Sequence, residues 1–186
     1  VNGSGSGSLS AQAPDANHWG IQRITSDVTS GNNSGLVLSN GTDAVPALNN
    51  LSGWEFQYIF RIPDIASMAI HVGLSNTGTF ADNRIVIKYD TADTDTLFRF
   101  QTCSGGTCTT QSSTVTVASN TWYRGRIRSS TAGVILFSVN GETEVSLSTN
   151  LPTTNLTPTF LVVTRTGAAR SLDADWFAMQ FRGAAR

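Results

Sequence analysis

TWYRGRIRSSTAGVILFSVNGETEVSL, residues 121–147, contains three extended runs of residues joined by two turns. In the first run, apolar or small residues alternate with a tryptophan and arginines, which is typical of a strand with one face on a core and one in water. The inward set is Tyr123, Gly125 and Ile127, and the outward set is Trp122, Arg124, Arg126 and Arg128. Asn140 and Gly141 tolerate the positive φ that a two-residue hairpin turn requires. The stretch therefore predicts a three-stranded antiparallel meander with one hydrated face.

The sequence on both sides of this meander has the same extended character. Runs bounded by turn-forming residues predict strands at 36–38, 54–62, 68–74, 84–89, 96–102, 113–117, 159–165 and 171–181. The last two runs are apolar on both faces, which indicates strands that are central in a sheet or that bend. No segment has a sustained helical period. About ten to twelve short strands without helices predict a β-sandwich or a barrel.

Length and composition suit a single β domain. The chain has 186 residues, enough for one sizeable core, and only 13% of them are charged. The net charge of −1 provides no overall field that would attract nucleic acid. No apolar run approaches the roughly 20 residues that cross a bilayer as a helix. We therefore expect neither nucleic-acid binding nor membrane insertion.

Residues 1–18 are rich in glycine and serine and have almost no large apolar side chains. This composition is typical of a linker, so the sequence predicts an N-terminal arm at 1–18 and a folded domain at 19–186. Such an arm has no hydrophobic reason to be ordered by itself. We expect a neighbouring subunit in an assembly to hold it.

The only two cysteines lie in CSGGTC, residues 103–108. The two glycines at the tip allow a tight turn that brings the Cβ atoms of Cys103 and Cys108 to bridging distance. The spacing favours a disulfide, which would indicate exposure to an oxidising medium, and a pair of free thiols is the alternative. A zinc site is disfavoured because His18 and His71 are the only histidines.

Five segments of the C-terminal two-thirds carry a family resemblance. They are WEFQYIFRI (54–62), WYRGRIR (122–128), VILFSVNG (134–141), LTPTFLVVTRTG (156–167) and RSLDADWFAMQF (170–181). Together they resemble the concanavalin A-like lectin/glucanase jelly roll, also called the laminin-G-like sandwich, of the kind seen in bacteriophage structural proteins. The resemblance implies an all-β, antiparallel jelly-roll sandwich, here with an extended N-terminal arm. It implies less about function, because this fold hosts lectins, glycanases and purely structural modules.

Two pairs of acidic residues have the alternate spacing that glycoside hydrolases use on one strand. Retaining enzymes hold the two carboxyl groups about 5–5.5 Å apart. Glu142 and Glu144 follow a hairpin tip, whereas Asp173 and Asp175 lie on the last predicted strand beside Trp176. Neither strand has a third carboxylate, and outward acids commonly pair with arginine. We therefore expect no catalytic residues and no enzyme activity, with a divergent glycoside hydrolase as the enzymatic alternative.

The turn DTADTD, residues 90–95, concentrates hard oxygen ligands. Calcium takes about 6–8 oxygens, which Asp90, Asp93 and Asp95 could supply together with backbone carbonyls. The resemblance adds that lectins and laminin-G-like domains often bind calcium in loops at one end of the sandwich. The same residue types are also ordinary turn formers. Calcium is therefore the one cofactor candidate, and no other cofactor is expected.

The outward side chains of the run at 122–128 form a stripe of one tryptophan and three arginines. Three interpretations stay open for it: a subunit interface, a hydrated face with internal cation–π pairs, or a glycan site in which aromatic rings stack on sugars. Asp173, Asp175 and Trp176 are further candidates for a ligand site or an interface.

These observations favour a non-enzymatic structural or adhesion module of a virion, such as a phage decoration, fibre or tail protein, or of a cell-surface assembly. Its partners would be copies of itself, other capsid or surface proteins, or surface glycans. Its location would be the virion or the extracellular space. A secreted carbohydrate-binding module is the alternative. The preference for a non-enzymatic structural module rests on the resemblance and on the missing catalytic set.

Overall fold

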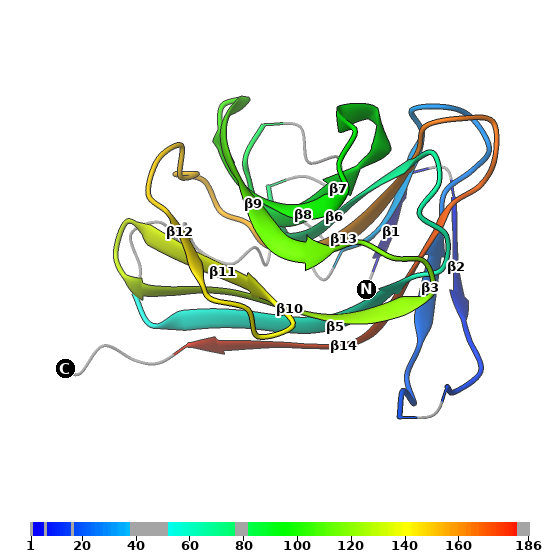
Figure 1. Cartoon of the computed structure of the whole chain (residues 1–186), viewed down its shortest axis with the longest axis horizontal. Coiled ribbons are helices and arrows are strands. Elements are labelled where there is room, and N and C mark those ends of the chain that lie inside the picture. The colour runs from blue at the N-terminus through cyan, green and yellow to red at the C-terminus, as the bar shows by residue number, and fades with distance from the viewer. Residues whose placement is uncertain (1, 6, 16, 38–51, 77–81, 182–186) are drawn as a thin grey trace.

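The structure, a computed structural model, describes residues 2–5, 7–15, 17–37, 52–76 and 82–181. Within these ranges two antiparallel sheets of seven strands pack face to face (Figure 1). No helix in them is long and apolar enough to cross a membrane. The all-β jelly-roll sandwich predicted from the sequence is confirmed.

One sheet, the upper layer in Figure 1, has the strand order β1-β4-β13-β6-β7-β8-β9, and we call it the front sheet. Its strands are β1 (Asn2–Gly5), β4 (Asn33–Val37), β13 (Thr157–Thr164), β6 (Met68–Ser75), β7 (Arg84–Asp90), β8 (Leu97–Ser104) and β9 (Thr107–Thr116). A short 3-10 turn, η2 (Thr91–Asp93), joins β7 to β8. Figure 1 shows that this sheet curves away from the other one at both the η2 end and the β8–β9 hairpin end.

The other sheet, which we call the back sheet, is the lower layer in Figure 1. It has the strand order β12-β11-β10-β5-β14-β3-β2 and is flatter in this view. Its strands are β12 (Val145–Leu147), β11 (Val134–Val139), β10 (Thr121–Thr131), β5 (Trp54–Ile62), β14 (Ser171–Phe181), β3 (Gln22–Thr25) and β2 (Ser8–Ala11). The three strands β10, β5 and β14 are its long central members.

The core between the sheets is rich in aromatic rings. On β5, Phe56, Tyr58 and Phe60 alternate with outward residues and are fully buried. Phe160 of β13 meets Tyr58 edge to face, with ring centroids 5.7 Å apart. Burial of each such side chain stabilises the fold by about 1.5–3 kcal/mol. The alternation on β5 therefore fixes which of its side chains point away from the core.

Strands β10, β11 and β12 form the meander predicted from the sequence. Asn140 and Gly141 have φ angles of 51° and 77°, as a turn with two left-handed residues requires. Gly125 lies on the core face of β10, where an added Cβ would be 2.2 Å from the ring of Tyr58. Only glycine lets β10 approach the core this closely.

The two strands predicted to be apolar on both faces are central in their sheets. β13 lies between β4 and β6, and β14 lies between β5 and β3. β14 contains a bulge between Ala174 and Trp176, where its pairing with β5 shifts by one residue. The shift keeps both Ala174 and Phe177 on the core side and turns Trp176 outward. A regular strand would have placed Trp176 on the same side as Ala174.

The glycine- and serine-rich start of the chain pairs with strands of the same chain. β1 is antiparallel to β4 in the front sheet, and β2 is antiparallel to β3 in the back sheet. Within the chain, backbone hydrogen bonds hold this arm on a strand of each sheet, and such bonds need no apolar side chains. Contact of the arm with a neighbouring subunit stays a prediction.

Candidate binding surface

Three neighbouring strands of the back sheet, β10, β5 and β14, present their outward side chains on one face, which we call the outer face. The strand register arranges these side chains in four rows. The rows are Trp122 with Arg61 and Asp173, Arg124 with Ile59 and Trp176, Arg126 with Gln57 and Ala178, and Arg128 with Glu55 and Gln180. Six of the seven residues predicted as ligand or interface candidates thus lie in these rows, and the seventh, Asp175, lies in the adjoining bulge.

The row around Trp122, which we call the closed end, is covered by the chain itself. The ring of His18 stacks on Trp122 with centroids 3.8 Å apart and planes 14° apart. The guanidinium carbon of Arg61 lies 4.7 Å from the centroid of the Trp122 ring, within cation–π range. Asp15 accepts hydrogen bonds from Arg61 (2.7 Å) and from the Trp122 indole (3.4 Å). Trp122 therefore makes internal contacts, which is one of the three interpretations that the sequence left open.

The Asp173 and Asp175 carboxylates are both held by basic side chains at this end. Asp173 is completely buried and accepts hydrogen bonds from Arg23 (2.6 Å) and Arg61 (2.7 Å). The hydrogen bond to Asp173 raises the pKa of the Arg23 guanidinium. Asp175 accepts a hydrogen bond from the ring of His18 at 2.8 Å. These contacts give both aspartates basic partners within the chain.

The opposite end of the outer face, which we call the open end, has a second network of charges. Arg126 donates from Nε and Nη2 to the two oxygens of Glu55, both at 2.9 Å. A further bond of 3.1 Å joins Arg126 Nη1 to Glu144. Glu144 also accepts from Arg128, through Nε at 2.6 Å and through Nη2. The hydrogen bond from Arg128 lowers the pKa of Glu144, so this carboxyl is ionised at neutral pH.

A cavity of about 210 Å³ opens beside these charges. Its walls are formed by Gly53, Trp54, Glu55, Arg126, Arg128 and Ser130. The sequence pattern did not indicate the cavity, because the ends of two strands far apart in the sequence form its walls.

Between the two ends lies a row with an apolar centre and an exposed aromatic ring. Trp176 is 43% exposed and stands opposite Ile59, whose other neighbour across the strands is Arg124. The Arg124 side chain is exposed and donates to the side-chain oxygen of Gln57. This row combines a flat ring, an aliphatic floor and a planar hydrogen-bond donor on a rigid sheet.

The alternately spaced pair Glu142 and Glu144 is divided between two networks. Glu144 belongs to the open end, whereas Glu142 accepts hydrogen bonds from the hydroxyls of Ser113 (2.7 Å) and Thr114 (2.6 Å) on β9. Burial alone would raise the pKa of Glu142, but these hydrogen bonds and two backbone amides lower it overall. A general acid needs a raised pKa, so neither glutamate is suited to that role.

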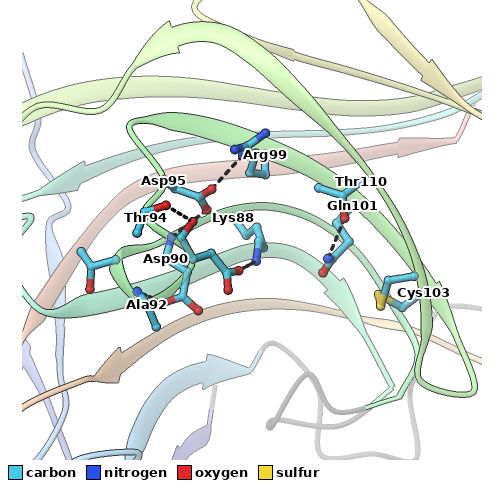
Figure 2. Close-up of polar contacts among 12 residues, drawn as sticks. Lys88, Asp90, Ala92, Thr94, Asp95, Arg99, Gln101, Cys103 and Thr110 are labelled. Atoms are coloured by element: carbon cyan, nitrogen blue, oxygen red, sulfur yellow. Dashed lines mark hydrogen bonds and ion pairs between the residues drawn. A yellow bond between two sulfur atoms is a disulfide. The ribbon is translucent and has the colours of Figure 1, made fainter.

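The three aspartates of the turn after β7 each have a basic partner, and Figure 2 shows the pair of Asp95 with Arg99. Asp90 pairs with Arg165, Asp93 with Lys88 and Asp95 with Arg99. The hydrogen bond from Lys88 lowers the pKa of Asp93. Asp90 also caps η2 by accepting from the Ala92 amide at 2.9 Å. In the part of the chain that the structure describes, no group of three acidic, histidine or cysteine side chains is placed to hold a metal ion. The three aspartates that the sequence suggested as calcium ligands are instead partners in ion pairs.

Cys103 and Cys108 are joined by a disulfide, as the spacing favoured. They are directly opposite each other in the β8–β9 hairpin. Gly105 and Gly106 at its tip have φ angles of 55° and 81°. The bond ties the two strands at the end of the front sheet that curves away from the back sheet (Figure 1).

The two histidines have different environments, which their local sequences did not indicate. His18 joins the closed end through Asp175, a residue 157 positions away in the sequence. His71 is partly buried on β6 of the front sheet, where desolvation first, and then the charges of Arg84 and Lys88, lower its pKa to about 3. His71 is therefore neutral at physiological pH and a very weak base.

Comparisons with known proteins identify the fold but no activity. No curated protein matches the chain significantly. The chain is similar to the crystal structure of the protein of unknown function SO2946 from Shewanella oneidensis MR-1, with a TM-score of 0.66, 17% identity and coverage of 96% of this chain and 77% of that one.

Two further solved structures have carbohydrate ligands or functions in their names. The carbohydrate-binding module CBM66 from Bacillus subtilis has a TM-score of 0.60 and 10% identity, with 96% of this chain and 94% of that one covered. The GH16 protein of the Bacteroides ovatus mixed linkage glucan PUL, solved in complex with a G4G4G3G product, also has a TM-score of 0.60 and 10% identity. The match covers 92% of this chain and 85% of that one. At this identity the likeness shows a shared jelly-roll fold.

The sequence itself gives a more specific assignment. The model of the family described as "SO2946-like, C-terminal domain" matches residues 17–172, which include the whole of β10 and β5 and the start of β14. The chain therefore belongs to the SO2946-like, C-terminal domain family.

Proposed function

We propose that this domain is a non-enzymatic adhesion module that binds glycans on the outer face of the back sheet. The observation that carries the proposal is the central row, in which Trp176, Ile59 and Arg124 lie side by side and Trp176 is 43% exposed. The flat indole ring offers a surface for the C–H groups of a sugar ring, and the guanidinium of Arg124 offers donors to its hydroxyls.

The state of the carboxylates supports a binding role over a catalytic one. Hydrolysis by the usual route needs one carboxyl group that is protonated at working pH and a second one across the bond. Asp173 and Glu144 are instead held by arginines, and Asp175 by His18. The shared fold with CBM66 is consistent with this proposal, since a named carbohydrate-binding module uses the same architecture.

Affinity electrophoresis in gels containing mixed-linkage glucan, dextran or mannan tests the proposal. We expect at least one polysaccharide to retard the protein and Trp176→Ala to weaken binding at least about tenfold, as for an aromatic residue central to an interface. Trp19→Ala is the matched control, because Trp19 is 79% exposed and lies outside the rows of the outer face. Equal retardation of both variants would contradict the role of Trp176.

A second candidate is self-assembly in a virion or cell-surface structure, and one observation favours it. Phe177 and Phe181 on β14 are 43% and 56% exposed, which is unusual for core-side residues of a strand. Light scattering after size-exclusion chromatography tests this candidate: an oligomer that becomes a monomer on Phe181→Ser would support it. A monomer at every concentration would count against it.

A further inference from the structure

The cavity at the open end is lined in part by charged side chains that do not belong to the Trp176 row. It measures about 210 Å³, smaller than the roughly 300–1,000 Å³ of pockets for drug-sized ligands. Such a volume suits a single small group. Glu55 of β5 and Trp176 of β14 both belong to the rows of the outer face, so the cavity opens on the same face as the proposed glycan-binding row of Trp176.

The charged groups of the cavity already satisfy one another. Each planar fork of a guanidinium can bind one carboxylate with two parallel hydrogen bonds. The Nε–Nη2 fork of Arg126 is taken by Glu55, and the same fork of Arg128 is taken by Glu144. The Nη1–Nη2 edge of Arg128 remains, but Nη2 is shared with the ionised Glu144, which would repel a ligand carboxylate there.

The net charge of this group also disfavours an ionic ligand. Two arginines face two glutamates, so their charges cancel. An anion would gain little from the arginines before meeting the repulsion of Glu55 and Glu144, and a cation would meet the arginines in the same way. The cavity is therefore matched to a neutral group.

Several hydrogen-bond donors remain beside the occupied forks. A guanidinium has five N–H groups. Arg126 uses three of them on Glu55 and Glu144 and keeps two, and Arg128 uses two on Glu144 and keeps three, counting partners among the described residues. Single N–H donors suit hydroxyl oxygens, and carboxylate oxygens accept from hydroxyl groups. The ion pairs also hold the donors in place before a ligand arrives, which lowers the entropy cost of binding.

We propose that this cavity is a subsite for one neutral polyhydroxylated ring, a sugar unit without a carboxylate or amine. The inference rests on the proposed glycan-binding function and narrows its ligand class to neutral sugars at this end of the outer face.

Chemical-shift titrations of the labelled protein with D-glucose, D-galactose, D-mannose and D-glucuronate test the ligand class. We expect at least one neutral sugar to shift the backbone amides of Gly53 and Ser130 and the Nε–H signals of Arg126 and Arg128. Glucuronate should bind the cavity at least about tenfold more weakly, since its carboxylate meets the negative charges of Glu55 and Glu144. Shifts with none of the neutral sugars, or equal affinity for glucuronate, would overturn the inference.

The variant Arg128→Lys tests the part played by the guanidinium. Lysine keeps the charge but loses the planar fork that fixes the donors, so neutral-sugar affinity should fall about tenfold. Arg99→Lys is the matched control, because Arg99 also binds one carboxylate through Nε (2.8 Å, to Asp95) but lies on the front sheet. Loss of affinity in neither variant, or in both, would refute the assignment.

The same titrations separate this inference from the proposed function. Trp176→Ala should abolish retardation by polysaccharide while leaving the monosaccharide shifts at Gly53 and Ser130 unchanged. If polysaccharide retards Trp176→Ala as strongly as the unsubstituted protein, the proposed role of Trp176 is refuted. The subsite is then judged by the monosaccharide titration alone. If the platform variant behaves as expected but no sugar shifts the cavity signals, the subsite alone fails.

Discussion

At the closed end of the outer face, Trp122 is covered by His18, whereas at the open end Arg126 and Arg128 line a cavity. Both ends combine arginines with acidic residues on the same three strands. They differ in burial, because Asp173 is fully enclosed while the side chain of Glu144 is 26% exposed. Removing one partner from a buried charge network is costly because it leaves a buried charge uncompensated, whereas a more exposed network contributes little to stability and stays accessible to a ligand.

The largest expected effect that sharpens this comparison is on stability at the closed end. Asp173→Ala removes the shared partner of Arg23 and Arg61 and leaves only Asp15, which binds Arg61, to offset their charges, so the free energy of unfolding should fall by about 3 kcal/mol. Urea denaturation measures the change. The paired variant at the open end, Glu144→Ala, should cost less than about 1 kcal/mol. Similar losses for both variants would remove the distinction between the ends.

The two tryptophans of the outer face provide the next test. Trp122→Ala removes a ring that contacts His18 and Arg61, so we expect a loss of about 2 kcal/mol of stability, below the cost for a fully buried ring. Trp176→Ala should leave stability within about 1 kcal/mol and act on polysaccharide binding instead. Thermal unfolding together with affinity electrophoresis measures both properties. A Trp122 variant that is stable but does not bind would reverse the roles assigned to the rings.

The smallest effect concerns acid stability at the open end. The pKa of Glu144 in the folded protein lies below its ordinary value of 4.5, so its ion pairs stabilise the fold above that value. The stabilisation is lost as the pH falls through the folded pKa. We expect Glu144→Gln to flatten the decline of unfolding free energy below pH 4.5 by less than about 1 kcal/mol, since the pair is exposed. A steeper decline in the variant would show that Glu144 is not stabilised as its ionised form.

The predictable part of the candidate site was its placement on one face. Alternation on 121–128 put Trp122 and the arginines on the side of β10 away from the core, and the burial of Tyr123 and Ile127 agrees with it. The partners of these residues could not be predicted. Arg61 reaches Asp15 and Asp173, which lie 46 and 112 positions away in the sequence. Such contacts depend on strand order, which alternation does not encode.

The exposure of Trp176 was also beyond sequence reasoning. A regular strand at 171–181 would place Leu172, Ala174 and Trp176 together on one face. The bulge at Asp175 turns Trp176 to the opposite face from Ala174. A bulge adds one unpaired residue without a distinctive local pattern here, so only the pairing with β5 reveals it.

By itself the sequence determined the strand character of the chain, the hairpin turn at Asn140 and Gly141, and the family to which it belongs. The strand character and the hairpin turn follow from period-two alternation and from backbone preferences, which are local. The tertiary structure alone decided which charges are buried together, which tryptophan is covered and where a cavity opens. Those properties arise from strands far apart in the sequence that meet in one sheet, and their energies depend on burial, which no local pattern specifies.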